Sequence, residues 1–412
     1  MKKIHFTGIG GAGMAPLAEL ALAKNFAVTG SDETDSAKVQ HLRSLGAQIA
    51  IGHQAANLPD DAQLLVYSSA VPENNCERLK AVQLGIPQLR RGAFLAELAA
   101  LCRRCVAVTG THGKSSITAA LVMILRACGK DPGYTIGAEV QDLSSCAWGD
   151  GDIFVTEADE SDGTHTLLKN FLAVIPNIED DHEWSLGGRE ILEKNFRQTA
   201  QNSDKILYYA SAKCDELLSA HPAALRLAGS PENFAGLHGF QAANARIAAE
   251  AAVMLGCDRE KAFEAAANYP QVARRMTIHY QDENLTVIED YAHHPTEVEA
   301  ALKLLRMNYP KAHLRVLFQP HRFARLEKYF AEFVQVLRKA DTVFIAPVFA
   351  AWSETGSAGS AELAEAVGAK AISGSYQQQA EAVKSDLPGR SVIAVLGAGD
   401  VNKVIAFLLP RK

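Results

Sequence analysis

Short apolar runs that alternate with helix-length segments are the feature that most constrains the fold of this chain. Examples are Lys3–Thr7, Phe26–Gly30, Leu64–Ser68, Cys105–Thr109, Ile153–Glu157, Ala173–Asn177, Leu285–Asp290, Leu314–Gln319, Thr342–Ala346 and Ser391–Leu396. Strands that are separated by helices form parallel sheets through crossover connections. The alternation therefore predicts an α/β fold, with ligands bound at the carboxyl ends of the strands.

The length of 412 residues corresponds to two or three domains. Three units of strand, glycine-containing loop and helix begin near the start, near residue 105 and near residue 276, so we expect domains over residues 1–104, 105–275 and 276–412. The net charge of −6 offers no global basic surface for nucleic acid, and no apolar run approaches the roughly 18 residues of a membrane span. We expect a soluble cytoplasmic protein whose seven cysteines are reduced thiols.

The opening stretch IHFTGIGGAGM places a glycine-rich loop between an apolar run and a helix-like segment. Gly8, Gly10 and Gly13 fit the dinucleotide fingerprint G-x-G-x-x-G, and Asp32 follows about twenty residues later, near the position of a ribose-binding acid. Glycines allow the backbone to approach a pyrophosphate at a helix N-terminus. NAD, FAD and UDP-sugars all carry a pyrophosphate, so a nicotinamide oxidoreductase is one alternative.

A second glycine loop, VAVTGTHGKSS, is the strongest local signal in the chain. Lys114 follows a glycine and precedes two hydroxyl residues at a predicted helix start, where it can neutralise phosphate oxygens while Ser115 reaches Mg²⁺. The strict Walker A pattern has a glycine where this chain has Val108, so we expect a variant phosphate loop that turns at Gly110. The loop residues expected to contact phosphate are Gly110, Thr111, His112, Gly113, Lys114, Ser115 and Ser116.

Carboxylates crowd the ends of the next two predicted strands. The stretch FVTEADESD supplies Glu157, Asp159, Glu160 and Asp162, with Asp152 just upstream, and NIEDDHEW supplies Asp180, Asp181 and His182. Repulsion among like charges favours a bound cation, and Mg²⁺ prefers oxygen ligands. The alternatives are a solvated acidic loop and a structural histidine.

Two histidine-containing motifs follow predicted strands in the last third of the chain. They are DYAHHPTEV, with His293 and His294, and FQPHRFAR, with His321, Arg322 and Arg325. Arginine suits bidentate binding of a substrate carboxylate. We expect at least one of the histidines to be a core or cap residue. The later turn VLGAGD is at least as well explained as a structural turn.

Together, HFTGIGGAGM, TGTHGKSS, EADESD, NIEDDH, DYAHHPTEV and FQPHRFAR resemble the motifs of the Mur ligase family in order and place, over nearly the whole chain. This family makes amide bonds with ATP in peptidoglycan synthesis. The resemblance implies a Rossmann-like N-terminal domain for a UDP-sugar, a P-loop-type central ATPase domain with a parallel sheet, and a Rossmann-like C-terminal domain for the amino acid. It also implies that a substrate carboxylate attacks the γ-phosphate of ATP and that the acyl phosphate then reacts with an amine.

The resemblance further implies roles for single residues. The UDP-sugar would contact Gly8, Gly10, Gly11, Ala12, Gly13, Met14, Asp32 and Ser69. ATP and its metal ions would be held by the phosphate loop together with Glu157, His182, Gln241, Asn244, Arg275 and Asp290. In this set Ser115, Glu157 and His182 are the metal ligands, and Arg275 bridges domains near the phosphates. The amino acid would contact His293, His294, Arg322 and Arg325.

The motifs favour UDP-N-acetylmuramate and L-alanine as substrates, with ATP and two Mg²⁺ ions as cofactors. They indicate small-molecule partners and carry no signal for an oligomeric state. Two alternatives come from departures from the family pattern. The stretch ARRM is similar to that of the member that adds a tripeptide during muropeptide recycling. The shortened segment between His182 and Asn244 fits a catalytically weakened binding protein that retains the fold.

Overall fold

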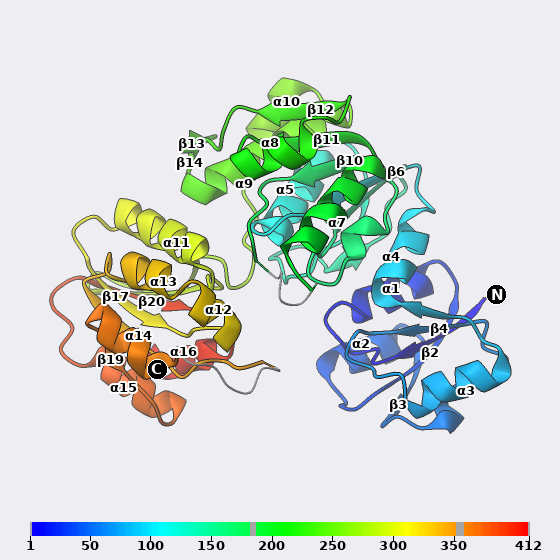
Figure 1. The fold of residues 1–412 in the computed structure, drawn as a ribbon, viewed down its shortest axis with the longest axis horizontal. Helices are drawn as coiled ribbons and strands as arrows, with labels where there is room; N and C mark the ends of the chain where they lie inside the picture. Colours follow the sequence, from blue (N-terminus) through cyan, green and yellow to red (C-terminus); the bar gives the residue numbers. More distant parts are fainter. Residues whose placement is uncertain (1, 182–186, 352–357, 411–412) are drawn as a thin grey trace. The chain divides into compact units, whose positions relative to one another are not determined.

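The computed structural model describes residues 2–181, 187–351 and 358–410, and its strands and helices alternate along much of the chain. Within these residues the strands form a five-stranded, a seven-stranded and a six-stranded sheet, with one additional two-stranded sheet (Figure 1). The chain divides into two compact units, residues 1–237 with 241–270 and residues 238–240 with 271–412. The first unit contains the five- and seven-stranded sheets, and the second contains the six-stranded sheet.

The five-stranded sheet is parallel throughout and has the order β3-β2-β1-β4-β5. Its strands are β1 (Lys3–Thr7), β2 (Ala27–Asp32), β3 (Gln48–Ile51), β4 (Leu64–Tyr67) and β5 (Gln88–Arg90). Its helices are α1 (Ala15–Ala23), α2 (Ala37–Ser44), α3 (Cys76–Leu84) and α4 (Arg91–Ala99). The order of the strands reverses between β1 and β4, so the first glycine loop, which follows β1, lies where such folds bind ligands.

The seven-stranded sheet has the order β12-β11-β10-β6-β9-β7-β8. Its strands are β6 (Arg104–Val108), β7 (Gly133–Thr135), β8 (Cys146–Ala147), β9 (Ile153–Glu157), β10 (Asn170–Ile175), β11 (Ser203–Tyr209) and β12 (Ala224–Leu227). The helices of this part are α5 (Lys114–Ala127), α7 (Arg189–Gln201), α8 (Ala212–Leu218), α9 (Gly239–Met254) and α10 (Arg259–Ala265). Because β6 is central and pairs in parallel with β9 and β10, the loops after these three strands meet at one edge.

The first two sheets share one hydrophobic core. Buried residues of the five-stranded part, such as Ile4 and Phe94, belong to the same cluster as Phe154 and Leu168 of the seven-stranded part. Trp148, just after β8, donates its indole N–H to the carbonyl oxygen of Leu20 in α1 at 2.8 Å. The two sheets are therefore held as one unit by packing as well as by the chain between them.

The six-stranded sheet has the order β15-β16-β20-β17-β18-β19 and is parallel except at the antiparallel pair β15–β16. Its strands are β15 (Thr277–Gln281), β16 (Leu285–Asp290), β17 (His313–Phe318), β18 (Thr342–Ile345), β19 (Lys370–Ala371) and β20 (Ser391–Leu396). Its helices are α11 (Pro295–Asn308), α12 (Phe323–Lys328), α13 (Phe330–Leu337), α14 (Ser360–Val367), α15 (Tyr376–Lys384) and α16 (Ile405–Leu408). Alternate residues of the central strands face two core clusters, one under α11, α13 and α14 and one under α15 and α16.

The α/β prediction is confirmed, and four predicted strands, β1, β9, β16 and β20, have the observed bounds. The domain boundaries near residues 104 and 275 stay predictions, because the first two sheets form one compact unit. None of the helices in the described part of the chain is long and apolar enough to cross a membrane.

Candidate active site

The first glycine loop is held against the end of β2. Gly8 has a φ of +77°, a conformation that favours glycine. The amides of Gly8 and Ile9 donate to the carbonyl oxygen of Ser31 at 2.9 and 3.0 Å. The Gly10 amide donates to Oδ2 of Asp32 at 2.8 Å. Asp32 thus supports the loop itself, and the nucleotide contact predicted for it stays a prediction.

The other residues predicted to bind the UDP-sugar differ in their surroundings. Ala12 and Gly13 face a pocket between the first two sheets. Met14 is 1% exposed and packs in the shared core beneath the loop. Ser69 is exposed in the turn after β4, whose end lies beside that of β1. The strand order therefore gathers these residues at one edge, but Met14 contributes mainly to packing.

A buried carboxylate that the sequence motifs did not indicate lies under this loop. Glu77, at the start of α3, is fully buried. It accepts hydrogen bonds from the hydroxyls of Ser31 and Thr7 at 2.7 and 2.8 Å and from the amide of Asn57 at 3.0 Å, and its Oε2 lies 3.2 Å from Nε2 of His5. Burial raises the pKa of Glu77, but these hydrogen bonds outweigh it and lower the pKa to about 2.

The second glycine loop turns where the sequence predicts. Gly110 has a φ of +127°, and a Cβ there would lie 2.6 Å from the carbonyl oxygen of Asn177. Gly113, just before α5, has a φ of +87°, and a Cβ there would lie 2.8 Å from Oδ1 of Asn244. Both positions therefore require glycine, for backbone conformation and for space.

Lys114 folds back over this loop. Its Nζ donates to the carbonyl oxygens of Gly110 and Thr111 at 2.8 and 3.3 Å and to the carboxylate of Glu160 at 2.8 and 3.1 Å. Burial raises the pKa of Glu160 to about 7, although the charge of Lys114 acts in the opposite direction. The lysine is thus surrounded by oxygen atoms, as it would be beside a phosphate group.

Ser115 and Glu157 lie side by side at the start of α5 and the end of β9. The Ser115 hydroxyl donates to Oε2 of Glu157 at 2.8 Å, and the Gly137 amide donates to Oε1. Burial raises the pKa of Glu157, with the Ser115 hydrogen bond opposing it. A hydroxyl next to a carboxylate is a donor set that fits Mg²⁺. His182, the second predicted metal ligand, lies outside the described residues.

Residues after β10 anchor the phosphate loop. Oδ1 of Asn177 accepts from the His112 amide at 2.8 Å, and its Nδ2 donates to the His112 carbonyl oxygen at 3.2 Å. The Glu179 amide donates to Oγ1 of Thr111 at 2.8 Å, and the Glu179 carboxylate lies 3.4 Å from Nε2 of His112. Sequence reasoning did not single out Asn177, although its place directly after a strand is a usable signal.

Helix α9 brings a further predicted residue to the phosphate loop. Asn244 is buried beside Gly113 and donates from Nδ2 to the hydroxyl of Tyr269 at 3.1 Å. Gln241 lies one turn earlier on the same helix and is partly exposed.

The two glycine loops line one pocket, with a volume of about 280 Å³. From the five-stranded part it is lined by Ala12, Gly13, Pro16, Leu17, Arg91 and Leu95. From the seven-stranded part it is lined by Lys114, Ser115, Thr135, Ile136, Gly137, Glu157 and Asp159. Groups suited to a pyrophosphate and groups suited to a nucleotide phosphate thus face the same space.

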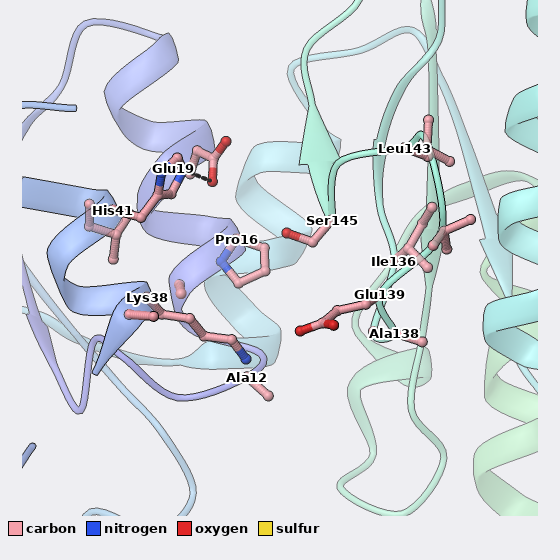
Figure 2. Close-up of a pocket in the computed structure, with 15 residues that line it drawn as sticks. Ala12, Pro16, Glu19, Lys38, His41, Ile136, Ala138, Glu139, Leu143 and Ser145 are labelled. Carbon is pink, nitrogen blue, oxygen red and sulfur yellow. Dashed lines mark ion pairs between the residues drawn. The ribbon is translucent and has the colours of Figure 1, made fainter. Parts of the chain in front are cut away.

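A second, larger pocket of about 390 Å³ adjoins it and shares Ala12, Pro16, Ile136 and Gly137 with it. Its walls come from α1, α2 and the segment between β7 and β8. Figure 2 shows Lys38 of α2 and Glu139 of that segment pointing into the pocket from opposite sides. Glu19 and His41 form an ion pair of 3.3 Å at its edge. Most of its remaining lining is apolar, which suits an uncharged part of a ligand.

The second unit gathers predicted residues at the carboxyl end of β16. Asp290 is 3% exposed and accepts hydrogen bonds from the amides of Ala292 and Met276, both at 2.8 Å. Burial raises the pKa of Asp290 to about 6, with the charge of Arg275 opposing it. Arg275 itself donates to Oε1 of Glu297 at 3.3 Å.

The histidine motifs of the second unit meet in space. Nδ1 of His293 lies 2.9 Å from the carbonyl oxygen of Tyr291, and the rings of His293 and His321 have centroids 5.5 Å apart. Burial lowers the pKa of His293 well below its ordinary value, so the ring is neutral near pH 7. Nη1 of Arg325 lies 3.1 Å from Nδ1 of His321. The parallel pairing of β16 and β17 with β20 explains why these two motifs come together.

Two other predicted residues of these motifs act at helix starts. His294 is 3% exposed and caps α11, because its Nδ1 accepts from the Thr296 amide at 3.4 Å. Arg322 precedes α12 with a φ of +68°, and its amide donates to the carbonyl oxygen of Phe349 at 2.8 Å. His294 is the cap residue that the sequence allows for, and the amino-acid contacts of both residues stay predictions.

Comparison with known proteins identifies the class. The sequence-family model described as "Mur ligase family, catalytic domain" matches residues 3–103 of this chain. The family model described as "Mur ligase, glutamate ligase domain" matches residues 274–400. The chain belongs to the Mur ligase family, whose members are ATP-dependent ligases. This membership does not favour the nicotinamide oxidoreductase that the opening fingerprint left open.

Individual members of the family show which ligases this chain is similar to in sequence and in fold. The chain is 34% identical to a UDP-N-acetylmuramate–L-alanine ligase of Nitratidesulfovibrio vulgaris, over 98% of this chain and 97% of the relative. A UDP-N-acetylmuramate–alanine ligase of Thermotoga maritima has the same fold, with a TM-score of 0.80, 24% identity, and coverage of 99% of this chain and 98% of that one. A murein peptide ligase of Psychrobacter arcticus is similar in fold, with a TM-score of 0.69 and 21% identity. The match covers 99% of this chain and 98% of that one.

Proposed function

We propose that this protein joins the carboxylate of UDP-N-acetylmuramate to the amine of L-alanine, with conversion of ATP to ADP and phosphate. The full-length likeness to a ligase of that name supports the choice of substrates. These substrates belong to the making of peptidoglycan precursors. The sugar nucleotide and ATP are metabolites of the cell interior, so we place the reaction in the cytoplasm.

The pocket shared by the two glycine loops carries this proposal. A ligase of this kind must bring the carboxylate of one phosphorylated substrate to the terminal phosphate of another. The first glycine loop and Arg91 line one side of the pocket, and Lys114 and Ser115 line the other. A nucleotide-sugar on the first loop and ATP on the second can therefore meet there, with the larger apolar pocket free for an uncharged part of the sugar nucleotide.

We assign the steps around phosphate to residues of the seven-stranded part. Lys114 leaves Glu160 and neutralises the terminal phosphates while the substrate carboxylate attacks, because phosphoryl transfer depends on positioning and charge neutralisation. Ser115 and Glu157 would hold one Mg²⁺ ion, and His182 would hold a second. Bound Mg²⁺ supplies charge stabilisation to the phosphate oxygens. Gln241, Asn244, Arg275 and Asp290 would contact ATP.

We assign capture of the amino acid to the second unit. His293 is neutral and next to Glu297, with a carboxylate oxygen 3.2 Å from its Nδ1, and we expect His293 to face the incoming amine. Arg322 and Arg325 would bind the carboxylate of the amino acid, with His294 fixing the start of α11. The three sheets would then act as domains for the sugar nucleotide, ATP and the amino acid, with boundaries near residues 104 and 275.

Phosphate release tests the assignment directly. The full-length protein with ATP and Mg²⁺ is expected to release phosphate only when both UDP-N-acetylmuramate and L-alanine are present. Glycine, L-serine and the recycling tripeptide in place of L-alanine should give much slower release. Release that does not depend on the sugar nucleotide would refute the proposal, and preference for the tripeptide would move the protein to the recycling activity.

The Lys114→Ala variant separates the proposed catalytic role from folding. We expect phosphate release to fall by about a hundredfold or more, since a preorganised cation beside the transferring phosphate is lost. Lys169→Ala is the matched control, because Lys169 is an exposed lysine just before β10 in the same part of the chain. Unchanged turnover of folded Lys114→Ala would remove the phosphate-binding role.

A further inference from the structure

Arg91 is the charged residue of the shared pocket that no sequence motif indicates. It is the first residue of α4, in the five-stranded part, and it lines the pocket together with Lys114. A Cβ on Gly13 would lie 2.7 Å from Nη1 of Arg91 and 2.9 Å from its Cδ. The guanidinium group is therefore packed directly against the first glycine loop.

Arg91 is paired with an acid of the seven-stranded part, in the loop after β9. Its Nη2 donates to Oδ2 of Asp162, whose Oδ1 accepts from the amide of Thr164 at 3.0 Å. The side chains of Arg91 and Asp162 are 26% and 22% exposed, and Arg91 lines the pocket, so a ligand there can reach the arginine. The turn at Thr164 fixes the acid, and the arginine is the partner with the longer and more adaptable side chain.

The same acidic loop holds both cations of the pocket. Glu160 binds Lys114 at the second glycine loop, and Asp162, two residues later, binds Arg91 at the first. Each cation donates hydrogen bonds to carboxylate oxygens, as it would to phosphate oxygens in a complex. Each glycine loop therefore has a cation of the pocket beside it, and each of these cations is hydrogen-bonded to a carboxylate that would compete with phosphate.

We propose that Arg91 binds the diphosphate of the sugar nucleotide at the first glycine loop, and that Asp162 holds Arg91 in place until the diphosphate replaces it. The proposal rests on the function proposed above. Arg91 packs against the first loop, whereas Lys114 already serves the second, so the sugar nucleotide and not ATP is its ligand. A guanidinium group can bind two phosphate oxygens at once through bidentate hydrogen bonds. A partly exposed ion pair, such as that of Arg91 and Asp162, is weak enough to be displaced.

Calorimetric titration with UDP-N-acetylmuramate, in the absence of ATP, tests the proposal on the full-length protein. We expect Arg91→Ala to weaken binding by about tenfold or more, because a charge-assisted contact to phosphate is lost. Arg91→Lys keeps the positive charge but loses the bidentate hydrogen bond to phosphate. This variant should bind UDP-N-acetylmuramate several-fold more weakly than the wild type. Asp162→Asn removes the competitor, and it should bind as tightly as the wild type or a few-fold more tightly.

Two controls test whether the effect is specific to Arg91 and to the sugar nucleotide. Arg90→Ala removes the neighbouring, exposed arginine and should change the affinity less than twofold. Titration of each variant with a non-hydrolysable ATP analogue and Mg²⁺ should give wild-type affinity, which separates the two phosphate sources. Thermal unfolding of Arg91→Ala, Arg91→Lys and Asp162→Asn shows whether each variant is folded.

The outcomes are distinguishable. If the wild type does not bind UDP-N-acetylmuramate, the proposed function fails. If the wild type binds and folded Arg91→Ala and Arg91→Lys bind equally well, only the role of Arg91 is overturned. If Arg91→Ala and Asp162→Asn weaken binding to the same extent, the pair is a structural link and the proposed exchange is wrong. A loss of affinity for the ATP analogue alone would also overturn it.

Discussion

Two buried glutamates show how neighbouring groups decide the charge of single residues. Glu77 and Glu160 are both almost inaccessible to solvent. Four hydrogen-bonding side chains lower the pKa of Glu77 to about 2, whereas burial raises that of Glu160 to about 7. The carboxylate of Glu77 is therefore fixed in its charged form under the first glycine loop. That of Glu160 is close to accepting a proton when its partner Lys114 is drawn away by a phosphate.

Glu77→Gln tests the buried network at the residue scale. Because the pKa in the folded protein, about 2, is below the ordinary value of 4.5, the carboxylate stabilises the folded protein above pH 4.5. That contribution is lost as the pH falls from 4.5 towards 2. At pH 7 we expect the variant to be destabilised by about 3 kcal/mol, since each pKa unit corresponds to about 1.4 kcal/mol.

Urea unfolding at pH 7 and pH 3.5 measures this difference. The loss of stability relative to the wild type should be smaller at pH 3.5, and Glu73→Gln, an exposed glutamate a few residues earlier, should change stability little at either pH. A destabilisation of Glu77→Gln that stays the same at both pH values would contradict a charged carboxylate at this position.

At the scale of elements, the position of Arg91 depends on how closely α4 approaches the acidic loop. Gly92 is the second residue of α4, and a Cβ there would lie 2.3 Å from Oγ1 of Thr164. Thr164 begins a short 3₁₀ turn and is 2% exposed, so it has little room to move. The glycine therefore allows the start of α4 to rest on the loop that carries Asp162.

Gly92→Ala should separate these two elements. We expect a destabilisation of about 1–3 kcal/mol from overpacking, measured by urea unfolding, and weaker binding of UDP-N-acetylmuramate because Arg91 is displaced. Thr164→Ala in the same chain should restore part of both. Gly229→Ala is the control, since a Cβ at that exposed glycine meets nothing within 4 Å. Wild-type stability of Gly92→Ala would show that α4 does not need this approach.

Elements also differ in how well the sequence predicts them. The strands β9, β16 and β20 are buried along most or all of their length, and their apolar runs predict both bounds. The edge strand β3 is partly exposed, and β7 and β19 have three and two residues. Such strands are too short or too exposed to carry a long apolar run, so only pairing with a neighbouring strand defines them.

At the scale of the whole molecule, the shared core of the first two sheets predicts how the chain divides. Phe154 and Leu168 belong to the cluster that contains Ile4 and Phe94, while the six-stranded sheet has two clusters of its own. An isolated segment 1–103 would expose the surface that these partners cover.

Truncated chains test this division. We expect residues 1–270 and residues 271–412, made separately, each to unfold cooperatively in urea. We expect residues 1–103 alone to be several kcal/mol less stable than the same region within 1–270, or to aggregate, because a large share of the apolar core is removed. Amide hydrogen exchange can follow segment 1–103 both alone and within 1–270. Equal stability of the segment in the two settings would show that the first sheet is an independent domain.

The sequence by itself determined the α/β class, the two glycine loops, the phosphate loop that turns at Gly110, and the carboxylates at the strand ends. These features depend on short-range patterns, in which apolar periodicity, glycine conformation and charge are visible within a few residues. The tertiary structure alone decided that Arg91, which lines the shared pocket, pairs with Asp162 and that Glu77 lies under the first loop. It also decided which of the predicted histidines caps a helix, namely His294. Those contacts join residues far apart in the chain or depend on burial, because strand order and core packing, which no local pattern contains, bring them together.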